Sequence, residues 1–333
     1  MAGAAMAVLA SPAVAREIKV KGSSTVLPYA EIVAENFQKS TQYKVTVEGG
    51  GSSAGLKDFC LGLGEDKIDI ANASRQIKKA EVETCAKNGV SDIIEVQFGY
   101  DGIVFASDVK GPAIALEPKD VFLAIAETVA YNGVPVPNEA KTLKDVNAAF
   151  PAWPIKFFIP GEKHGTREVF EEKVVIPGCK ASGTLEAYVK AGKDEKAAEA
   201  ACKKFNKDFA VDIDGDYTET LARLDSNKKS IGVFGLAFYE SNTDKLRVAT
   251  VSGVTPTGAT VASGEYPVSR PLFFYIKKAH LPVIPGLKEY AEFFVSEDMI
   301  GPGGPLETKG LVPAPDAERE AVRATVSDET TLK

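Results

Sequence analysis

The chain has 333 residues, with 44% hydrophobic residues, 26% charged residues and a net charge of −7. This composition is ordinary for a soluble globular protein, and the length is comfortable for two domains. No block of Lys and Arg stands out, which argues against a surface that binds nucleic acid or anionic membranes, so any anion site has to be built locally.

The first 15 residues are small and apolar, and Ala13-Val14-Ala15 fits an A-x-A cleavage site. We therefore expect residues 1–15 to be a signal peptide, truncated at its start because no positively charged region precedes it, with Arg16 opening the mature chain. Export would place the protein in the periplasm. The alternative is an apolar N-terminus without order. No other run approaches the ~20 apolar residues of a membrane-spanning helix.

Strand and helix patterns alternate along the first third of the chain. In order they are a strand at 17–22, a helix at 24–40, a strand at 43–49, a helix at 52–64, a strand at 68–73, a helix at 79–89, and an apolar run at 93–108 that forms one or two strands. Strands that alternate with helices pair in parallel, so this pattern predicts an α/β layer fold.

The middle of the chain predicts a second α/β unit, which an aromatic strand and two further helices follow. The predicted elements are a helix at 119–128, a strand at 155–160, a helix at 166–175, a long charged helix at 185–208, a strand with a short helix at 230–241, a strand at 245–251, an aromatic strand at 263–278, an amphipathic helix at 286–299, and a polar helix with a tail at 314–333.

The four cysteines fall into two pairs that are local in sequence. We expect the disulfides Cys60–Cys85 and Cys179–Cys202, which suit an oxidising periplasm, although four cysteines allow three pairings and could also be buried thiols. The sequence has no C-x-x-C motif and no histidine adjacent to a cysteine, so we do not expect a zinc site.

Three predicted strand-to-helix turns share small hydroxyl and glycine residues. They lie at 22–25, 49–55 and 163–167. Such turns direct free backbone N–H groups and the positive end of a helix dipole at one point. Each alone is more often an ordinary helix cap. Because none has the spacing of a phosphate loop or a dinucleotide motif, three together favour a small oxyanion over a nucleotide.

Two more stretches carry candidate ligands. Ser74 and Arg75 follow an apolar strand, and Arg75 together with Arg167 could supply two guanidinium forks that match a tetrahedral oxyanion. Asp101 stands inside an apolar strand-like run, where a salt bridge or a turn is the structural alternative. In an anion site, a carboxylate would accept a hydrogen bond from phosphate and repel sulfate, which carries no proton at neutral pH.

From about residue 16 to about residue 310, the sequence resembles the phosphate-binding proteins of bacterial ABC uptake systems, the PstS-like group. Seven short stretches in family order carry the resemblance: KGSSTVLPYAEIVAENFQ, VEGGGSSAGLKDF, IDIANASRQIKKAE, YDGIVFASD, GEKHGTREVFEE, IGVFGLAFYE and YPVSRPLFFYIK.

The resemblance implies a two-domain periplasmic-binding-protein clamp with two hinge crossings, near Ile103–Ser107 and Tyr266–Leu272. Domain one would comprise 16–104 plus 268–333, and domain two 105–267. The clamp would bind inorganic phosphate and deliver it to an inner-membrane ABC permease, as a monomer without a cofactor. By match to the family motifs, the ligands would be Ser24, Thr25, the Val26 backbone, Ser52, Ser53, Ser74, Arg75, Asp101, His164, Gly165, Thr166 and Arg167.

The sequence departs from the best-known members at two of these positions. Arg75 stands where they have a carboxylate, so we assign the proton-accepting role to Asp101. His164 replaces the serine of a Ser-Gly-Thr motif, and its imidazole can donate to an oxyanion or lie at the helix cap.

Other functions are weaker alternatives. The same architecture could bind phosphonate, sulfate, molybdate or tungstate. A phosphatase would need a general base, and the only nearby one, His164, has no evident orienting partner, so we do not expect an enzyme. Asp212, Asp214 and Asp216 lack the glycine and glutamate positions of a calcium loop and suggest a solvated acidic loop. A secreted scaffold protein is the remaining alternative.

Overall fold

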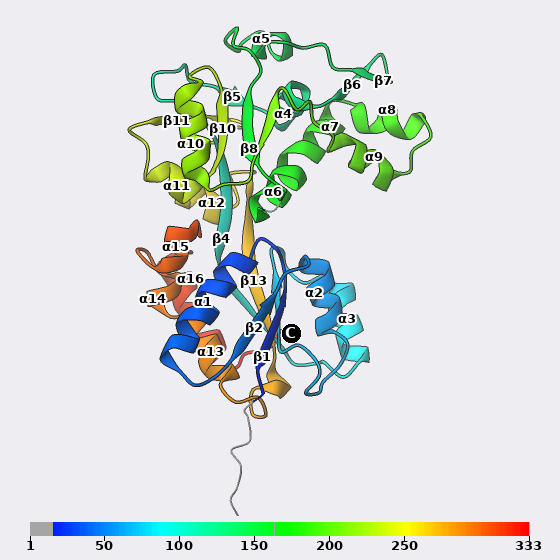
Figure 1. The fold of residues 1–333 in the computed structure, drawn as a ribbon. Coiled ribbons are helices and arrows are strands. Elements are labelled where there is room, and N and C mark those ends of the chain that lie inside the picture. The colour runs from blue at the N-terminus through cyan, green and yellow to red at the C-terminus, as the bar shows by residue number, and fades with distance from the viewer. Residues whose placement is uncertain (1–15, 163, 333) are drawn as a thin grey trace, which may run out of the picture.

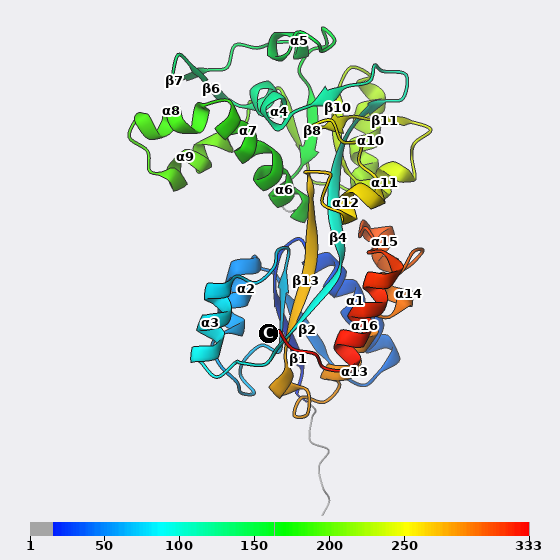
Figure 2. The same cartoon turned by 180° about the vertical axis from the view of Figure 1, so that it is seen from behind.

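Two lobes joined by two long strands make up the computed structural model, which describes residues 16–162 and 164–332 (Figure 1). The expected signal peptide lies outside these residues. The strands β4 (Ile93–Asp108) and β13 (Ser269–Lys277) run from one lobe to the other, as the view from behind also shows (Figure 2). The α/β class and the two-lobe clamp predicted from the sequence are therefore confirmed.

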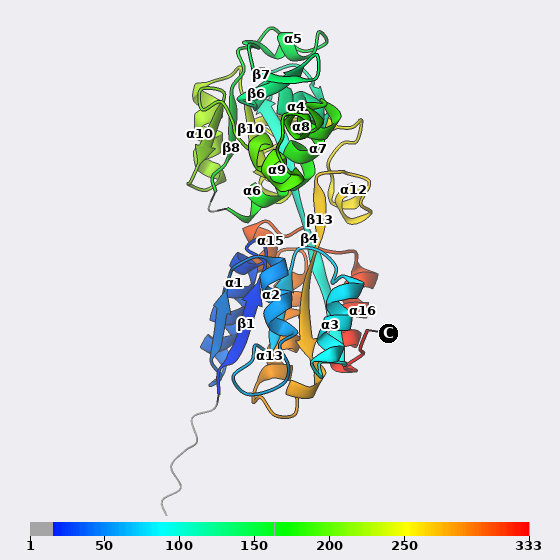
Figure 3. The same cartoon turned by 90° about the vertical axis from the view of Figure 1, so that its right-hand side faces the viewer.

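Lobe one contains both ends of the described chain. Its elements are β1 (Ile18–Gly22), α1 (Leu27–Ser40), β2 (Val45–Glu48), α2 (Ser52–Phe59), β3 (Ile70–Ala73), α3 (Lys79–Lys87), η2 (Lys278–His280), α13 (Leu287–Phe294), α14 (Glu297–Ile300), α15 (Pro305–Lys309) and α16 (Asp316–Ser327). The helices cover both faces of the sheet, with α2 and α3 on one side and α1, α13 and α16 on the other (Figure 1). Figure 3 views the molecule from the side of α2 and α3.

Lobe two is built from the middle of the chain. Its strands are β5 (Ala115–Leu116), β6 (Thr128–Tyr131), β7 (Val134–Pro137), β8 (Phe157–Pro160), β9 (Ala210–Ile213), β10 (Ile231–Gly235), β11 (Leu246–Val248) and β12 (Thr250–Val251). Its helices are α4 (Pro118–Ile125), α5 (Leu143–Val146), α6 (Gly165–Phe170), η1 (Glu171–Val175), α7 (Ile176–Ala181), α8 (Thr184–Lys190), α9 (Glu195–Cys202), α10 (Tyr217–Ser226), α11 (Leu236–Glu240) and α12 (Gly258–Ala262).

One continuous path of hydrogen-bonded strands passes through both lobes in the order β2-β1-β3-β13-β4-β10-β8-β9, with β11 added beside β4. The pairs β1–β2, β1–β3, β10–β8 and β8–β9 are parallel, whereas β13 is antiparallel to both β3 and β4. Parallel strands followed by helices place their carboxyl ends, and the turns that follow them, at the same edge of each half-sheet. Those edges face the gap between the lobes (Figure 1).

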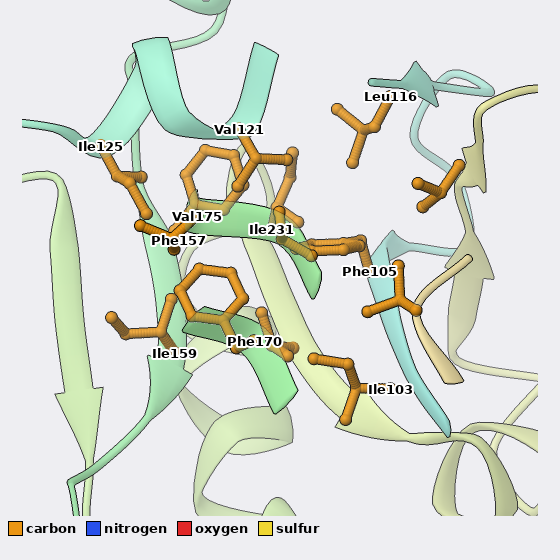
Figure 4. Packing of buried hydrophobic residues seen from close by; sticks show 14 of the residues in the cluster. Ile103, Phe105, Leu116, Val121, Ile125, Phe157, Ile159, Phe170, Val175 and Ile231 are labelled. Atoms are coloured by element: carbon orange, nitrogen blue, oxygen red, sulfur yellow. The ribbon is translucent and has the colours of Figure 1, made fainter. Parts of the chain in front are cut away.

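The hydrophobic cores follow the two lobes. In lobe one, Phe274 of β13 packs on Phe294 at a ring-centroid distance of 4.6 Å, whereas its neighbours Phe273 and Tyr275 belong to a cluster on the opposite face of the sheet. This alternation is the period-two pattern of a strand buried on both faces. In lobe two, Phe105, Phe157, Phe170 and their neighbours form a third cluster between the sheet and the helix formed by α6, η1 and α7 (Figure 4).

Both expected disulfides are present. Cys60–Cys85 joins the end of α2 to α3, and Cys179–Cys202 joins α7 to α9. Each bond connects two helices of one lobe, so neither bond links the lobes.

Some predicted elements differ from the structure. The long helix expected at 185–208 is two helices, α8 and α9, because Gly192 takes φ +94°, a left-handed conformation that interrupts the helix. The run 93–108 is a single strand, and the helix expected at 166–175 begins as α6 and widens into the π-helix η1. The β6–β7 hairpin was not predicted. None of the described helices is both long and apolar enough to cross a bilayer.

Candidate functional site

Two neighbouring cavities open between the lobes. The first, which we call the Asp101 cavity, measures about 350 Å³ and is lined by Thr25, Pro28, Tyr29, Asp101, Pro160, His164, Gly165, Thr166, Ile213, Gly215, Asp216, Tyr217, Thr218, Thr220, Val233, Gly235, Phe238, Thr308, Lys309 and Gly310. The second, which we call the Arg270 cavity, measures about 360 Å³ and is lined by Gly50, Gly51, Ser52, Ser53, Ala54, Ser74, Arg75, Glu168, Glu172 and Arg270. Each cavity has walls from both lobes.

The first serine-rich turn meets lobe two at Thr25. Its hydroxyl donates to the carbonyl oxygen of Gly165 at 3.3 Å and lies 3.4 Å from Oε2 of Glu168. A Cβ atom at Gly165 would lie only 2.5 Å from Cα of Thr25, so glycine is required for the lobes to approach this closely. Thr25 lines the Asp101 cavity and Glu168 lines the Arg270 cavity, so the contact between these two residues marks where the cavities adjoin.

A serine of the same turn binds the backbone just before α1. Oγ of the buried Ser23 accepts from the backbone N–H groups of Thr25 and Val26, at 3.1 Å and 3.4 Å. The Val26 N–H group, an expected ligand of the anion, thus already donates a long hydrogen bond within lobe one. Ser24, also expected as a ligand, is exposed and does not line either cavity.

The second turn, at 49–55, and the stretch Ser74-Arg75 converge in the Arg270 cavity. Ser52 begins α2, and its Oγ accepts from the backbone N–H of Ser74 at 3.1 Å and lies 3.2 Å from Ser74 Oγ. The helix can start beside β1 because a Cβ at Gly55 would meet Cα of Gly22 at 2.4 Å, a distance that only glycine tolerates. Two hydroxyls that follow different strands, both among the expected ligands, are therefore held together.

Arg270 on β13 is the residue that sequence reasoning missed. Its guanidinium is 4% exposed, and Nη1 donates to Ser74 Oγ at 3.0 Å. Among the described residues, Nε and Nη2 have no hydrogen-bond partner, although Nη2 lies 3.3 Å from Oε2 of Glu172. Buried arginines are rare unless paired, so an Arg within the apolar strand 269–277 was the available signal. The Nε–Nη2 edge makes no hydrogen bond and has the partly exposed carboxylate of Glu172 as its ionic neighbour, and its geometry matches that of an oxyanion.

Asp101 on β4 is 2% exposed, and its Oδ2 has no hydrogen-bond partner among the described residues. Burial raises the pKa of Asp101 to about 6, against an opposing influence of the positive charge of Arg270. Tyr29 of lobe one and Tyr217 of lobe two line the same cavity, and burial together with the Asp101 carboxylate raises their pKa values. The carboxyl group is thus a buried acceptor without a partner.

Arg75 lies at the rim of the Arg270 cavity and is already paired. Its guanidinium makes two hydrogen bonds to Glu81, at 2.8 Å and 2.9 Å, and donates to Ser53 Oγ at 3.1 Å. The hydrogen bond to Glu81 is the main reason that the pKa of Arg75 is raised. Ser53 therefore positions Arg75, and Arg75 could reach an anion only by exchanging these partners.

Arg167 is held inside lobe two. It is buried, with Nε donating to Glu171 at 2.7 Å, and Nη1 donating to Asp212 at 2.5 Å and to the carbonyl oxygen of Pro160 at 2.8 Å. Its guanidinium also covers the ring of Phe205. Arg167 lines neither cavity. The expectation that Arg167 offers its guanidinium to the anion stays a prediction. In this structure the buried arginine that lines a cavity beside the expected hydroxyl ligands is Arg270.

His164, Gly165 and Thr166 enter the Asp101 cavity at the start of α6, as expected of the third turn. Nε2 of His164 donates to the carbonyl oxygen of Asp214 at 3.1 Å, which fixes the ring against the acidic loop. In that loop, Asp216 caps α10. Within 16–162 and 164–332, no group of three or more His, Cys, Asp or Glu is placed to hold a metal ion.

Thr25 and Thr166 thus share one cavity, whereas Ser52 and Ser74 line the adjoining one.

The chain is similar in sequence and fold to known proteins. Residues 7–298 match the family model of the PBP superfamily domain. The chain belongs to this superfamily, in its PstS-like group. It is 30% identical to the phosphate-binding protein PstS of Staphylococcus haemolyticus over 90% of this chain and 82% of that protein.

Two further PstS-like comparisons agree with this assignment. The chain is 30% identical to the protein SphX of Synechococcus elongatus, over 78% of this chain and 68% of that protein. A crystal structure of "a possible phosphate binding protein" from Planctomyces limnophilus superimposes with a TM-score of 0.74 at 27% identity, covering 96% of this chain and all of that one. The family resemblance that the sequence motifs indicated is confirmed.

Proposed function

We propose that this chain is an extracytoplasmic phosphate-binding protein that closes its two lobes on inorganic phosphate and delivers it to an ABC permease of the inner membrane. The relatives named as phosphate-binding proteins support this proposal. The observation that carries it in this chain is Arg270, a buried guanidinium whose Nε and Nη2 atoms make no hydrogen bond among the described residues, placed beside the paired hydroxyls of Ser52 and Ser74.

The proposed clamp uses β4 and β13 as hinges. Domain one would comprise 16–104 plus 268–333 and domain two 105–267, with the hinge strands absorbing the motion. Closure would bring the start of α6 toward α2 and merge the two cavities around one anion. Thr25, Ser52, Ser74 and Arg270 would bind it from lobe one, and the backbone of Gly165 with the hydroxyl of Thr166 from lobe two.

The remaining predicted residues take subsidiary places in this proposal. Arg75 would join the anion only after releasing Glu81, and His164 would contact it only if its ring left Asp214. Ser24, Val26, Ser53 and Arg167 would support the turns that carry the ligands. Asp101 would accept a hydrogen bond from the protonated oxygen of phosphate, which offsets the cost of its burial.

We propose a transport receptor and not an enzyme. The Ser52 and Ser74 hydroxyls are hydrogen-bonded to each other, and Ser74 also accepts from Arg270. Among the described residues, neither hydroxyl is hydrogen-bonded to a His, Asp or Glu that could act as its general base. We also propose that the protein is periplasmic and monomeric, with the permease as its partner.

Calorimetric titration of the protein with phosphate, arsenate, sulfate and methylphosphonate tests the proposal. Phosphate and arsenate, which share size, shape and protonation, should bind with similar affinity, and sulfate should bind far more weakly. Failure of phosphate to bind to the folded protein would contradict the proposal. Tighter binding of methylphosphonate or sulfate than of phosphate would favour another oxyanion as the physiological ligand.

A further inference from the structure

Two carboxylates on one helix of lobe two face the anion donors of lobe one. Oε2 of Glu168 lies 3.4 Å from Oγ1 of Thr25, and Oε2 of Glu172 lies 3.3 Å from Nη2 of Arg270. The two residues are four positions apart along the continuous helix of α6 and η1, so they project from the same helix face. Both line the Arg270 cavity.

The contacts of these carboxylates distinguish them from their neighbour Glu171. Glu171 accepts from Arg167 and pairs with Lys203, both within lobe two, and so stabilises that lobe. Glu168 and Glu172 instead contact residues across the cleft. Arg75 and Arg167 are paired with other carboxylates, and the pKa of Lys173 is lowered by burial and by Arg270. Glu168 and Glu172 are therefore not the carboxylates that neutralise Arg75 and Arg167.

The electrostatic consequence depends on whether the ligand carries a proton. An anion bound by Thr25 and Arg270 would lie beside Glu168 and Glu172, because these donors already touch the two carboxylates. A fully deprotonated anion would be repelled at such a distance. An anion with a hydroxyl group could donate a charge-assisted hydrogen bond to the carboxylate instead. Repulsion of one ligand together with attraction of another is how binding sites gain specificity.

We propose that Glu168, assisted by Glu172, is a specificity-determining residue that admits protonated oxyanions to the cleft and rejects fully deprotonated ones. This inference rests on the proposed function, and it adds a second acceptor, on lobe two, to the hinge-strand carboxyl of Asp101. Closure would bring the helix that carries Glu168 closer to the anion, so the discrimination would act at the step that traps the ligand.

The test compares phosphate and sulfate affinities of the full protein at one neutral pH, for the wild type and for Glu168→Gln, Glu172→Gln and Glu168→Asp. Glu186→Gln on α8 is the matched control, because Glu186 is exposed, pairs with Lys190 within its own helix and loses the same charge. We expect Glu168→Gln to lower the phosphate-to-sulfate affinity ratio at least tenfold, chiefly by strengthening sulfate binding. Glu172→Gln should act in the same direction with a smaller effect.

The charged variant Glu168→Asp should keep a ratio close to that of the wild type, as should the control. A ratio unchanged within twofold in Glu168→Gln, or an equal gain for both anions, would overturn the inference and leave the proposed function intact. A wild type that binds phosphate and sulfate equally would also overturn it. A folded wild type that binds no phosphate would overturn the proposed function itself.

Discussion

Asp101 and Arg270 lie directly opposite each other on β4 and β13, the two strands that join the lobes. Residues opposite each other on antiparallel strands project to the same side of the sheet. Both side chains are almost completely buried, and each has a polar atom without a hydrogen-bond partner among the described residues. The hinge strands thus carry a positive donor and a carboxyl acceptor side by side, the pair that the proposed protonated anion would use.

The buried carboxyl of Asp101 gives the first prediction. Its pKa is raised from 3.8 to about 6, so the folded protein holds this proton more tightly than the unfolded chain does. The group therefore lowers stability as pH rises from about 4 to about 6 and remains unfavourable above that range. Asp101→Asn should be more stable than the wild type at neutral pH, by up to about 3 kcal/mol.

Urea denaturation in the absence of phosphate, repeated at several pH values, measures this difference. The gain of Asp101→Asn over the wild type should be small near pH 4 and should grow toward pH 6. A difference that stays constant over this range, or that favours the wild type at neutral pH, would show that Asp101 has a stabilising partner in the folded protein.

Arg270 gives the second prediction. Arg270→Met keeps the volume and removes the charge, and it should weaken phosphate binding about 100-fold, because truncating one partner of a buried charged contact typically costs 2–5 kcal/mol. Arg223→Met, on the exposed side of α10, serves as the matched control and should bind normally. Calorimetry on folded protein gives both affinities.

A comparison with Arg167→Met separates the two buried arginines. Because Arg167 is paired with Glu171 and Asp212 inside lobe two, its loss should cost about 3 kcal/mol of stability. Normal phosphate affinity in folded Arg270→Met, together with loss of binding in folded Arg167→Met, would reverse our assignment of the two residues.

The sequence predicted the parts of this molecule that depend on local pattern. The strand-helix alternation, the glycine- and serine-rich turns at Ser52 and Thr166, and the cysteine pairs all lie within short stretches whose residue types carry the signal. The family motifs added the two-lobe topology, which no local pattern contains.

The sequence did not predict properties that arise from contacts between distant segments. Arg167 is the last residue of the third turn, yet Asp212, 45 positions away, holds its guanidinium. Arg270 lies inside the family stretch YPVSRPLFFYIK but 196 positions from Ser74, and the pairing of β13 with β3 brings it to Ser74. The assignment of cations to the site depended on these long-range contacts, and sequence spacing does not report them.

The close approach of Gly165 to Thr25 gives the third prediction. Gly165→Ala would place a methyl group against the backbone of Thr25 and hold the lobes farther apart. We expect phosphate affinity to fall at least tenfold, with a change of less than about 1 kcal/mol in stability, since alanine favours the helix. Gly258→Ala, whose new Cβ would contact only Val312 at 4.0 Å, is the control.

Small-angle X-ray scattering with and without phosphate complements the affinities for this variant. The wild type should become more compact when phosphate is added, and Gly165→Ala should respond less at the same phosphate concentration. Full compaction and wild-type affinity in Gly165→Ala would mean that the lobes do not meet at this glycine when the cleft closes.

The disulfides give the fourth prediction. Cys60–Cys85 and Cys179–Cys202 close loops of 25 and 23 positions, so removing either one by a double Cys→Ala substitution should cost about 3.5 kcal/mol of stability on the chain-entropy estimate. Phosphate affinity of the folded variants should stay close to that of the wild type, since none of the four cysteines lines either cavity. Denaturant titration and calorimetry together check this, and a selective loss of binding would contradict it.

The most direct test of the account is a crystal structure of the protein grown with phosphate. We predict one phosphate ion between the lobes that contacts Thr25, Ser52 and Arg270 of lobe one together with Gly165 and Thr166 of lobe two, with one of its oxygens within hydrogen-bond distance of Asp101. A phosphate ion bound by only one lobe in a closed protein, or a closed cleft in which Ser52 and Thr166 reach different ligands, would contradict the account.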